Sequence, residues 1–175
     1  MAPQRVVSEM RRIATLVVTA LALGGAAHAQ TAALPAGASP EQAAYYAAVT
    51  QARASLPLFW QRMMENPGGP GDYSLKVVFP SPGGAIEDIW LTDVKRDGDH
   101  VVGRLNYDPE SMPNMHRGQT VPINQANIVD WSFKEGRKRY GEFTTRVLAK
   151  AHPEESAKTM ALLSDNPLPY EARTH

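Results

Sequence analysis

The chain has 175 residues, with 18 basic and 18 acidic side chains and a formal net charge of +0. This balance gives no electrostatic reason to expect nucleic acid or an anionic membrane as a partner, because both attract an excess of positive charge. The sequence contains no cysteine, which excludes disulfides, thiol nucleophiles and cysteine-ligated zinc.

The first 29 residues have the three-part pattern of a secretory signal. Three basic side chains open it: Arg5, Arg11 and Arg12. An apolar run over 13–23 follows, and a small-residue cleavage motif ends at Ala29. The run is shorter than the roughly 20 residues that cross a bilayer, so we expect cleavage after Ala29 and no transmembrane segment in the mature chain. Translation could begin at Met1 or Met10. The pattern predicts an exported protein, periplasmic or secreted.

Residues 30–38 are small and predict a flexible linker. The sequence of 39–42 (Ser-Pro-Glu-Gln) predicts a helix start with a capping box. Alanine-rich sequence continues this helix until Pro57 interrupts it. A second short helix is expected over 56–65, before a Gly/Pro-rich loop.

From residue 73 the apolar residues alternate with a period of two, which predicts strands. The expected strands are 73–79, 86–94, 101–107, 121–123 and 128–134. Apolar residues on both faces of 86–94 favour a central position, and Asp97-Gly98 predicts a hairpin to the next strand. A turn is expected over 135–141.

The C-terminal part is less clear, because 143–150 fits either a helix or a strand. A final helix is predicted from Pro153, with Met160, Ala161 and either Leu162 or Leu163 buried. We therefore expect an α+β fold in one domain over 39–165: N-terminal helices, an antiparallel sheet of about four or five strands, and a C-terminal helix. Residues 166–175 are expected to form a tail.

Several short segments in this order form a recognisable set: Ala52–Phe59, Lys76-Val77, Glu87–Trp90, Gly103–Asn106, Gly118-Gln119, Ile128–Trp131 and Tyr140–Arg146. Together they resemble the YegJ-like bacterial domain of unknown function, over about residues 43–148. In that pattern position 88 is more often histidine, so Asp88 departs from it and weakens any scheme that needs an imidazole there. The resemblance implies a small bacterial domain, often exported, and implies no reaction, cofactor or catalytic residue.

Glu87 and Asp130 are the candidate catalytic residues, because they are carboxylates set within apolar strand patterns. Paired carboxylates can act as acid and base when their environments separate their pKa values. The alternative is structural: Glu87 and Asp88 end a strand, and Asp130 faces water on the side opposite Trp131.

Four residues are candidates for binding: Trp90, Trp131, Arg137 and Arg139. The two tryptophans, with Phe79 and Tyr107, could form an aromatic platform for a sugar chain or a peptide, although aromatic residues at strand spacing are usually core. The two arginines belong to a basic cluster around a turn, together with Lys134, Lys138 and Arg146. This cluster could meet phosphate groups on a membrane surface or an acidic partner, or remain a solvated hairpin tip.

The sequence predicts no metal site and no cofactor. Its histidines lack H-x-x-x-H spacing, and neither a phosphate loop nor a G-x-S-x-G motif is present. The leading hypothesis is a non-enzymatic exported module that binds a protein or cell-envelope ligand through one face or edge of its sheet. The alternatives are a hydrolase of an envelope polymer, with Glu87 and Asp130 as acid and base, and an inhibitor or immunity-type protein.

Overall fold

The computed structural model describes residues 37–69, 71–80 and 86–169. The predicted signal at 1–29, and all but the last two residues of the linker, lie outside these ranges. The described part combines four α-helices with a six-stranded antiparallel sheet, which confirms the predicted α+β class with one strand more than expected. None of its helices is long and apolar enough to cross a membrane.

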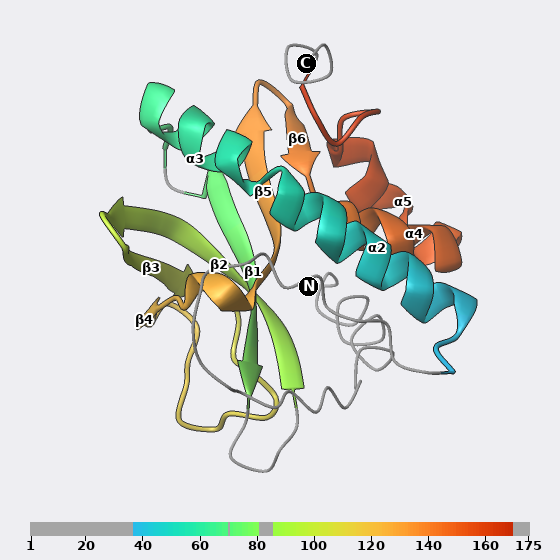
Figure 1. Ribbon diagram of the computed structural model, residues 1–175, viewed down its shortest axis with the longest axis horizontal. Coiled ribbons are helices and arrows are strands. Elements are labelled where there is room, and N and C mark those ends of the chain that lie inside the picture. Colours follow the sequence, from blue (N-terminus) through green and yellow to red (C-terminus); the bar gives the residue numbers. More distant parts are fainter. Residues whose placement is uncertain (1–36, 70, 81–85, 170–175) are drawn as a thin grey trace.

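Helices α2 (Pro40–Ala54) and α3 (Leu56–Glu65) follow one another across one face of the sheet (Figure 1). The predicted capping box is present: the Gln42 amide N–H donates to Ser39 Oγ at 3.2 Å, and the Ser39 amide N–H donates to Gln42 Oε1 at 2.7 Å. Ser55 separates the two helices, and Pro57 occupies the first turn of α3. Each helix therefore begins where the sequence predicts.

The six strands form the order β4-β3-β2-β1-β5-β6. They are β1 (Tyr73–Pro80), β2 (Ile86–Asp97), β3 (His100–Leu105), β4 (Thr120–Pro122), β5 (Ile128–Glu135) and β6 (Lys138–Gly141). A short 3₁₀ turn, η1 (Gln125–Asn127), precedes β5. The order confirms that β2 is a central strand. The expected turn over 135–141 is instead a hairpin, because Gly136 adopts a left-handed φ of 60° and lets β6 pair with β5.

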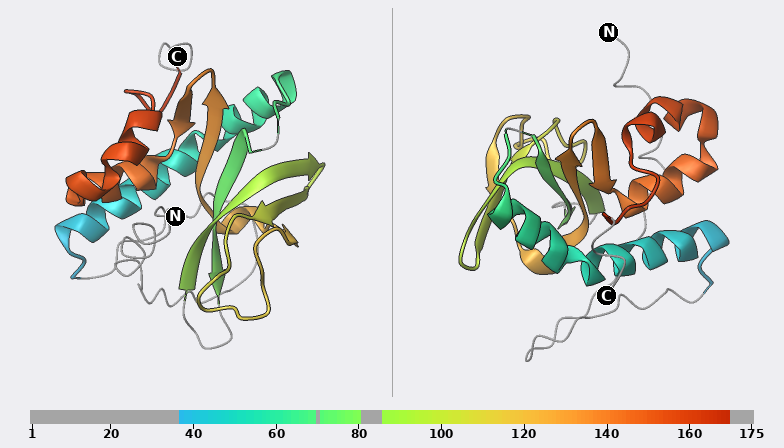
Figure 2. Two further views of the ribbon diagram at one scale, coloured as in Figure 1. Left: turned by 180° about the vertical axis from the view of Figure 1, so that it is seen from behind. Right: turned by 90° about the horizontal axis from the view of Figure 1, so that it is seen from above.

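Helices α4 (Phe143–Ala151) and α5 (Pro153–Leu162) pack beside each other at the β6 side of the sheet (Figure 2). The ambiguous segment is therefore a helix. The predicted burial in α5 is wrong for Met160, Ala161 and Leu162, which are exposed, and right for Leu163. The reason is that α5 packs on α4 through the buried Ser156, whose hydroxyl donates to the Ala149 carbonyl at 2.9 Å.

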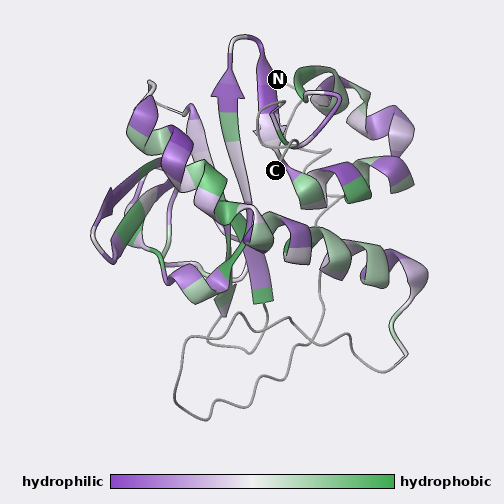
Figure 3. Cartoon of the chain, turned by 45° about the horizontal axis from the view of Figure 1, so that its top comes forward, coloured by the Kyte–Doolittle hydropathy of each residue, from purple (hydrophilic) through white to green (hydrophobic). Residues whose placement is uncertain are grey.

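The core lies between the sheet and the α2–α3 pair. Hydrophobic and hydrophilic residues alternate along the elements (Figure 3), so that each strand has a core face and an opposite face. Trp131 is completely buried there, with its ring stacked 5.6 Å from Phe133 and edge-on to Phe143 at 5.5 Å. Its Nε1 donates to the Ala52 carbonyl at 3.0 Å, which ties the end of α2 to the sheet.

Within the part of the chain that the structure describes, each edge of the sheet offers only a short run of backbone to a further strand. At one edge, β4 has only three residues and includes Pro122, which lacks an N–H to donate. At the other edge, Leu163 forms a parallel bridge with Arg139, and the Ser164 N–H donates to the Arg139 carbonyl at 2.9 Å. A ligand that binds by adding a strand therefore has little edge available. The faces of the sheet are the better candidates for a binding surface.

Candidate functional site

The sheet carries a polar face opposite the core. We define the polar face by seven residues: Ser74, Lys76, Asp88, Trp90, Thr92, Asp130 and Ser132. Lys76 pairs directly with Trp90 on one side and with Asp130 on the other, so these three side chains share one face. Glu87 pairs with Phe79 one residue away from Asp88, and so it points to the opposite face.

Glu87 and Asp130 are therefore on opposite sides of the sheet. The Glu87 carboxylate accepts hydrogen bonds from the Ser111 hydroxyl at 2.9 Å and from the Ser111 N–H at 3.1 Å. It thus holds the connection between β3 and β4. This arrangement brings the two carboxylates to no common cleft and gives no support to a catalytic pair.

Asp130 is fully buried, so the expectation that it faces water is wrong. Helix α4 begins directly over it, and its carboxylate accepts from the Phe143 N–H at 3.1 Å, the Thr144 N–H at 2.7 Å and the Thr144 hydroxyl at 2.6 Å. A carboxylate at a helix N-terminus is stabilised by the exposed N–H groups. Burial nevertheless raises the Asp130 pKa to about 6, against the opposing effects of Thr144 and Lys76. Its role is to anchor α4 to β5.

Lys76 lies at the centre of the polar face. Its ammonium donates to Thr144 Oγ1 at 3.2 Å, and lies 5.6 Å from the centroid of the Tyr45 ring and 5.9 Å from that of Trp90. At these distances a cation is attracted to the ring faces. The lysine charge is therefore held inside the protein, between α2, α4 and the sheet.

Tyr45 links α2 to the polar face, because its hydroxyl group donates a hydrogen bond to Asp88 Oδ2. Burial, and then the Asp88 charge, raise the pKa of Tyr45 well above its ordinary value, so the phenol stays protonated as a donor. The Asp88 carbonyl accepts a second hydrogen bond from Tyr107 at 3.0 Å. Asp88, where the family pattern more often has histidine, thus has a defined place in this network.

Trp90 marks the point where the polar face opens to solvent. Asp130 and Ser132, over β5, are fully buried, whereas Trp90 and Thr92 on β2 are half-buried. On β3, the Arg104 side chain is 47% exposed and forms an ion pair with Asp93. Trp90 therefore remains a candidate binding residue, with part of its surface accessible.

The Trp131 side chain is inaccessible to a ligand. Its burial is complete and its Nε1 is satisfied within the core. The strand alternation places it on the core face together with Leu75, its partner on β1. The proposed two-tryptophan platform is therefore wrong, because Trp90 and Trp131 lie on opposite faces.

The basic cluster is mostly engaged within the fold. Arg139 contacts the Gly71 carbonyl at 3.3 Å and lies 3.5 Å from Glu142, while Lys138 donates to the Ala161 carbonyl at 3.0 Å. These contacts tie β6 to the surrounding loops and to the end of α5. Arg137, at the tip of the hairpin, is exposed. The structure therefore assigns Arg139 a structural role and leaves Arg137 accessible.

No group of three or more potential metal-binding side chains occurs within 37–69, 71–80 and 86–169. His100 is exposed beside the β2–β3 hairpin, and the His116 side chain is 71% exposed. His152 lies between α4 and α5. These three histidines therefore belong to no common metal-binding group within the described residues.

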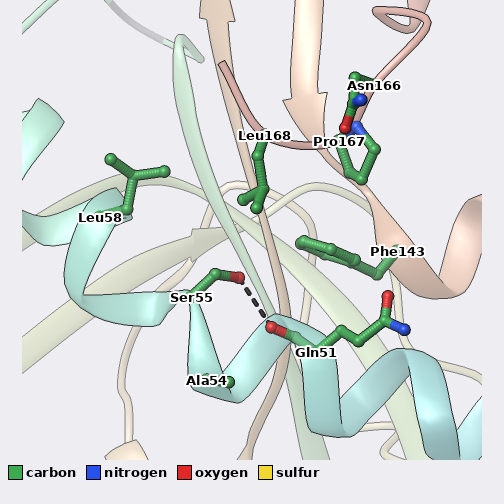
Figure 4. Close-up of a pocket in the computed structure, with 8 residues that line it drawn as sticks. All are labelled: Gln51, Ala54, Ser55, Leu58, Phe143, Asn166, Pro167 and Leu168. Atoms are coloured by element: carbon green, nitrogen blue, oxygen red, sulfur yellow. Dashed lines mark hydrogen bonds between the residues drawn. The ribbon is translucent and has the colours of Figure 1, made fainter. Parts of the chain in front are cut away.

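A separate open pocket of about 580 Å³ lies where the α2–α3 junction approaches the start of α4 (Figure 4). Its lining residues are Gln51, Ala54, Ser55, Leu58, Phe143, Asn166, Pro167 and Leu168. The Leu168 side chain points between Leu58 and Phe143. Residues 166–168, expected to belong to a tail, thus pack onto the fold and help to form this pocket.

Sequence reasoning missed Tyr45, Lys76 and Thr144, which meet only in the folded protein. Lys76 gave one signal, as a charged residue in the middle of an apolar strand pattern. Tyr45 and Thr144 gave none, because a helical tyrosine and a threonine are common on any surface.

Comparison with known proteins gives a family but no activity. Residues 42–161 match DUF2314, described as an uncharacterized protein conserved in bacteria. "Uncharacterized protein YegJ" of Escherichia coli (strain K12) is 35% identical over 74 residues, which are 42% of this chain and 48% of that protein. "Putative ankyrin repeat protein NMB1133/NMB1171" of Neisseria meningitidis serogroup B is 32% identical over 73 residues, which are 42% of this chain and 29% of that protein. The chain thus spans less than half the length of these relatives. No solved structure matches it significantly.

Proposed function

The chain belongs to the uncharacterised bacterial family DUF2314, and we propose that it is an exported, non-enzymatic module that binds a glycan of the cell envelope on its polar face. The observation that carries this proposal is the half-buried ring of Trp90, which lies on the open part of that face beside Asp88 and Lys76. The short edge strands favour a face of the sheet as the binding surface.

The chemistry of this surface suits an uncharged, hydroxyl-rich ligand. An aromatic ring offers an apolar surface on which the C–H face of a sugar can stack. One oxygen of Asp88 accepts from Tyr45, and the other is suited to accept from a sugar hydroxyl. Lys76 and Asp88 carry charges of opposite sign, so the polar face favours neither a strongly anionic nor a strongly cationic ligand.

Export is supported by the N-terminal pattern of basic residues, apolar run and small-residue cleavage motif at 5–29. An exported bacterial protein encounters glycan strands in the envelope. The contacts made by Glu87 and Asp130 favour binding over hydrolysis, because each carboxylate is engaged in holding a separate part of the fold.

The proposal is tested by co-sedimentation of the purified protein with peptidoglycan sacculi. We expect saturable binding, and a loss of affinity of about tenfold or more in Trp90→Ala, as for an aromatic anchor of an interface. Met64→Ala is the matched control, because Met64 is 74% exposed on α3, the helix that packs against the core face of the sheet through Phe59. Equal binding by wild type and Trp90→Ala, with both proteins folded, would contradict the proposal.

A further inference from the structure

The pocket at the α2–α3 junction provides a second surface, independent of Trp90. Its walls are apolar: Leu58 comes from α3, Phe143 from the first residue of α4, and Leu168 from the segment after α5 (Figure 4). Its volume of about 580 Å³ is within the roughly 300–1,000 Å³ of small-molecule sites in proteins.

The polar groups at the base of the pocket are already satisfied. Ser55 Oγ donates to the Gln51 carbonyl at 2.8 Å, and accepts from Trp131 Nε1 at 3.2 Å. Ser55 is thus committed to the bend between α2 and α3 and is not available to a ligand. Recognition at the base must therefore come from apolar contact with the walls.

Two side-chain amides remain available at the rim. Gln51 and Asn166 are both exposed, and within the described residues neither side-chain amide has a hydrogen-bond partner. They belong to different elements, α2 and the segment after α5. Each can both donate and accept a hydrogen bond, so they suit a polar end that carries amide or hydroxyl groups.

None of the eight lining residues is charged. A ligand ion would lose hydration here without an opposite charge to compensate, which disfavours anions and cations alike. We infer that this pocket binds an uncharged small molecule, with an aromatic or short aliphatic body packed against Leu58, Phe143 and Leu168 and a polar end at Gln51 and Asn166.

The experiment uses N-phenyl-1-naphthylamine, an uncharged apolar dye whose fluorescence rises on leaving water, titrated against the purified protein. Ala54→Phe fills the pocket from an exposed position on its lining. We expect saturable binding to wild type and a loss of affinity of about tenfold in Ala54→Phe. Ala47→Phe, at an exposed position on the same helix outside the pocket, should leave the affinity unchanged.

A second pair of variants tests the preference for an uncharged ligand, with the anionic dye 8-anilinonaphthalene-1-sulfonate as the comparison. Wild type should favour the uncharged dye, and Gln51→Lys should shift the preference towards the anionic one. Thr50→Lys, one residue away and outside the lining, should keep the wild-type preference.

Absence of saturable binding of the uncharged dye, or equal binding of that dye by wild type and Ala54→Phe, would overturn the inference. Neither result would bear on peptidoglycan binding at Trp90.

Discussion

Asp130 shows how one residue can be placed in a strand by sequence and still be misjudged. Alternation correctly puts it opposite Trp131, on the other face of β5. Exposure depends on what covers that face, and the cover is the start of α4, a segment that the sequence left open between helix and strand. The strand pattern itself was therefore interpreted correctly. The exposure of Asp130 was misjudged because the sequence did not show that the segment 143–150 is a helix that covers it.

The burial of Asp130 predicts a specific pH dependence. Its folded-state pKa is about 6, raised by burial above the ordinary value of 3.8, so between these pH values the folded protein binds more protons than the unfolded chain. The free energy of unfolding should therefore fall as pH rises from about 4 to about 6, by up to about 1.4 kcal/mol per pH unit from this group. Two further charged groups face Asp130: Lys76 lowers its pKa and Glu142 raises it.

The measurement is urea unfolding of wild type and Asp130→Asn at several pH values from 4 to 7. The variant should be less stable throughout, because an amide cannot accept all the hydrogen bonds of the carboxylate. The stability difference between the two proteins should shrink as pH rises from about 4 to about 6, and then stay constant. Glu154→Gln, an exposed acidic position in α5, serves as the control. Parallel pH profiles for wild type and Asp130→Asn would show that Asp130 has an ordinary pKa.

At the scale of elements, Gly141, the last residue of β6, packs directly against Trp131 of β5. Its φ is 77°, and a Cβ there would overlap the Trp131 carbonyl oxygen and the Trp131 ring. Gly136 has a similar φ of 60°, but nothing lies within 4 Å of where its Cβ would be. The two glycines therefore separate the cost of backbone conformation from that of steric overlap.

We expect Gly136→Ala to cost about 1 kcal/mol of stability, the usual penalty for a left-handed alanine. Gly141→Ala should cost about 3 kcal/mol or more, because β6 must also move away from Trp131. Thermal or urea unfolding of both variants measures the difference. Similar losses of stability in the two variants would mean that β6 can shift away from Trp131 without cost. That result would contradict a fixed position of β6, and with it of the start of α4 at Phe143, two residues further along the chain.

Element prediction succeeded where local chemistry is decisive. The capping box of α2, the break at Pro57 and the Asp97-Gly98 hairpin all depend on a few adjacent residues, and each was confirmed. β6 was missed because its four residues are mostly polar, and it exists through pairing with β5 and cover from Leu163. The burial of α5 was misjudged because its partner is α4 and not the sheet.

At the scale of the whole molecule, the fold class could be predicted from sequence but the site could only be predicted in part. Trp90 was a candidate from its sequence pattern, and its half-buried position supports it. The surroundings of Trp90 come from α2, β1 and α4, which are far apart along the chain. No local pattern could bring these together, just as none could bring Leu168 to the pocket wall.

The proposal of export makes a prediction for the whole chain. In bacterial cells that express the protein, we expect the extracytoplasmic fraction to contain a form that begins at Gln30, since the cleavage motif ends at Ala29. Cell fractionation followed by mass spectrometry of the intact protein measures this. A chain lacking residues 2–29 should remain in the cytoplasm, whereas export of that shortened chain would contradict the assigned signal.

The most direct test of the central claim is the tryptophan fluorescence of the protein titrated with soluble peptidoglycan fragments. Of the three tryptophans, Trp60 and Trp131 are buried in the core and Trp90 alone is half-buried on the polar face. Ligand stacking on Trp90 should shift or quench the emission of wild type in a saturable way, and Trp90→Phe should lose this response while retaining the signal of the two core rings. A saturable response that persists in Trp90→Phe, or binding with no change in wild-type emission, would contradict the assignment of the polar face as the binding surface.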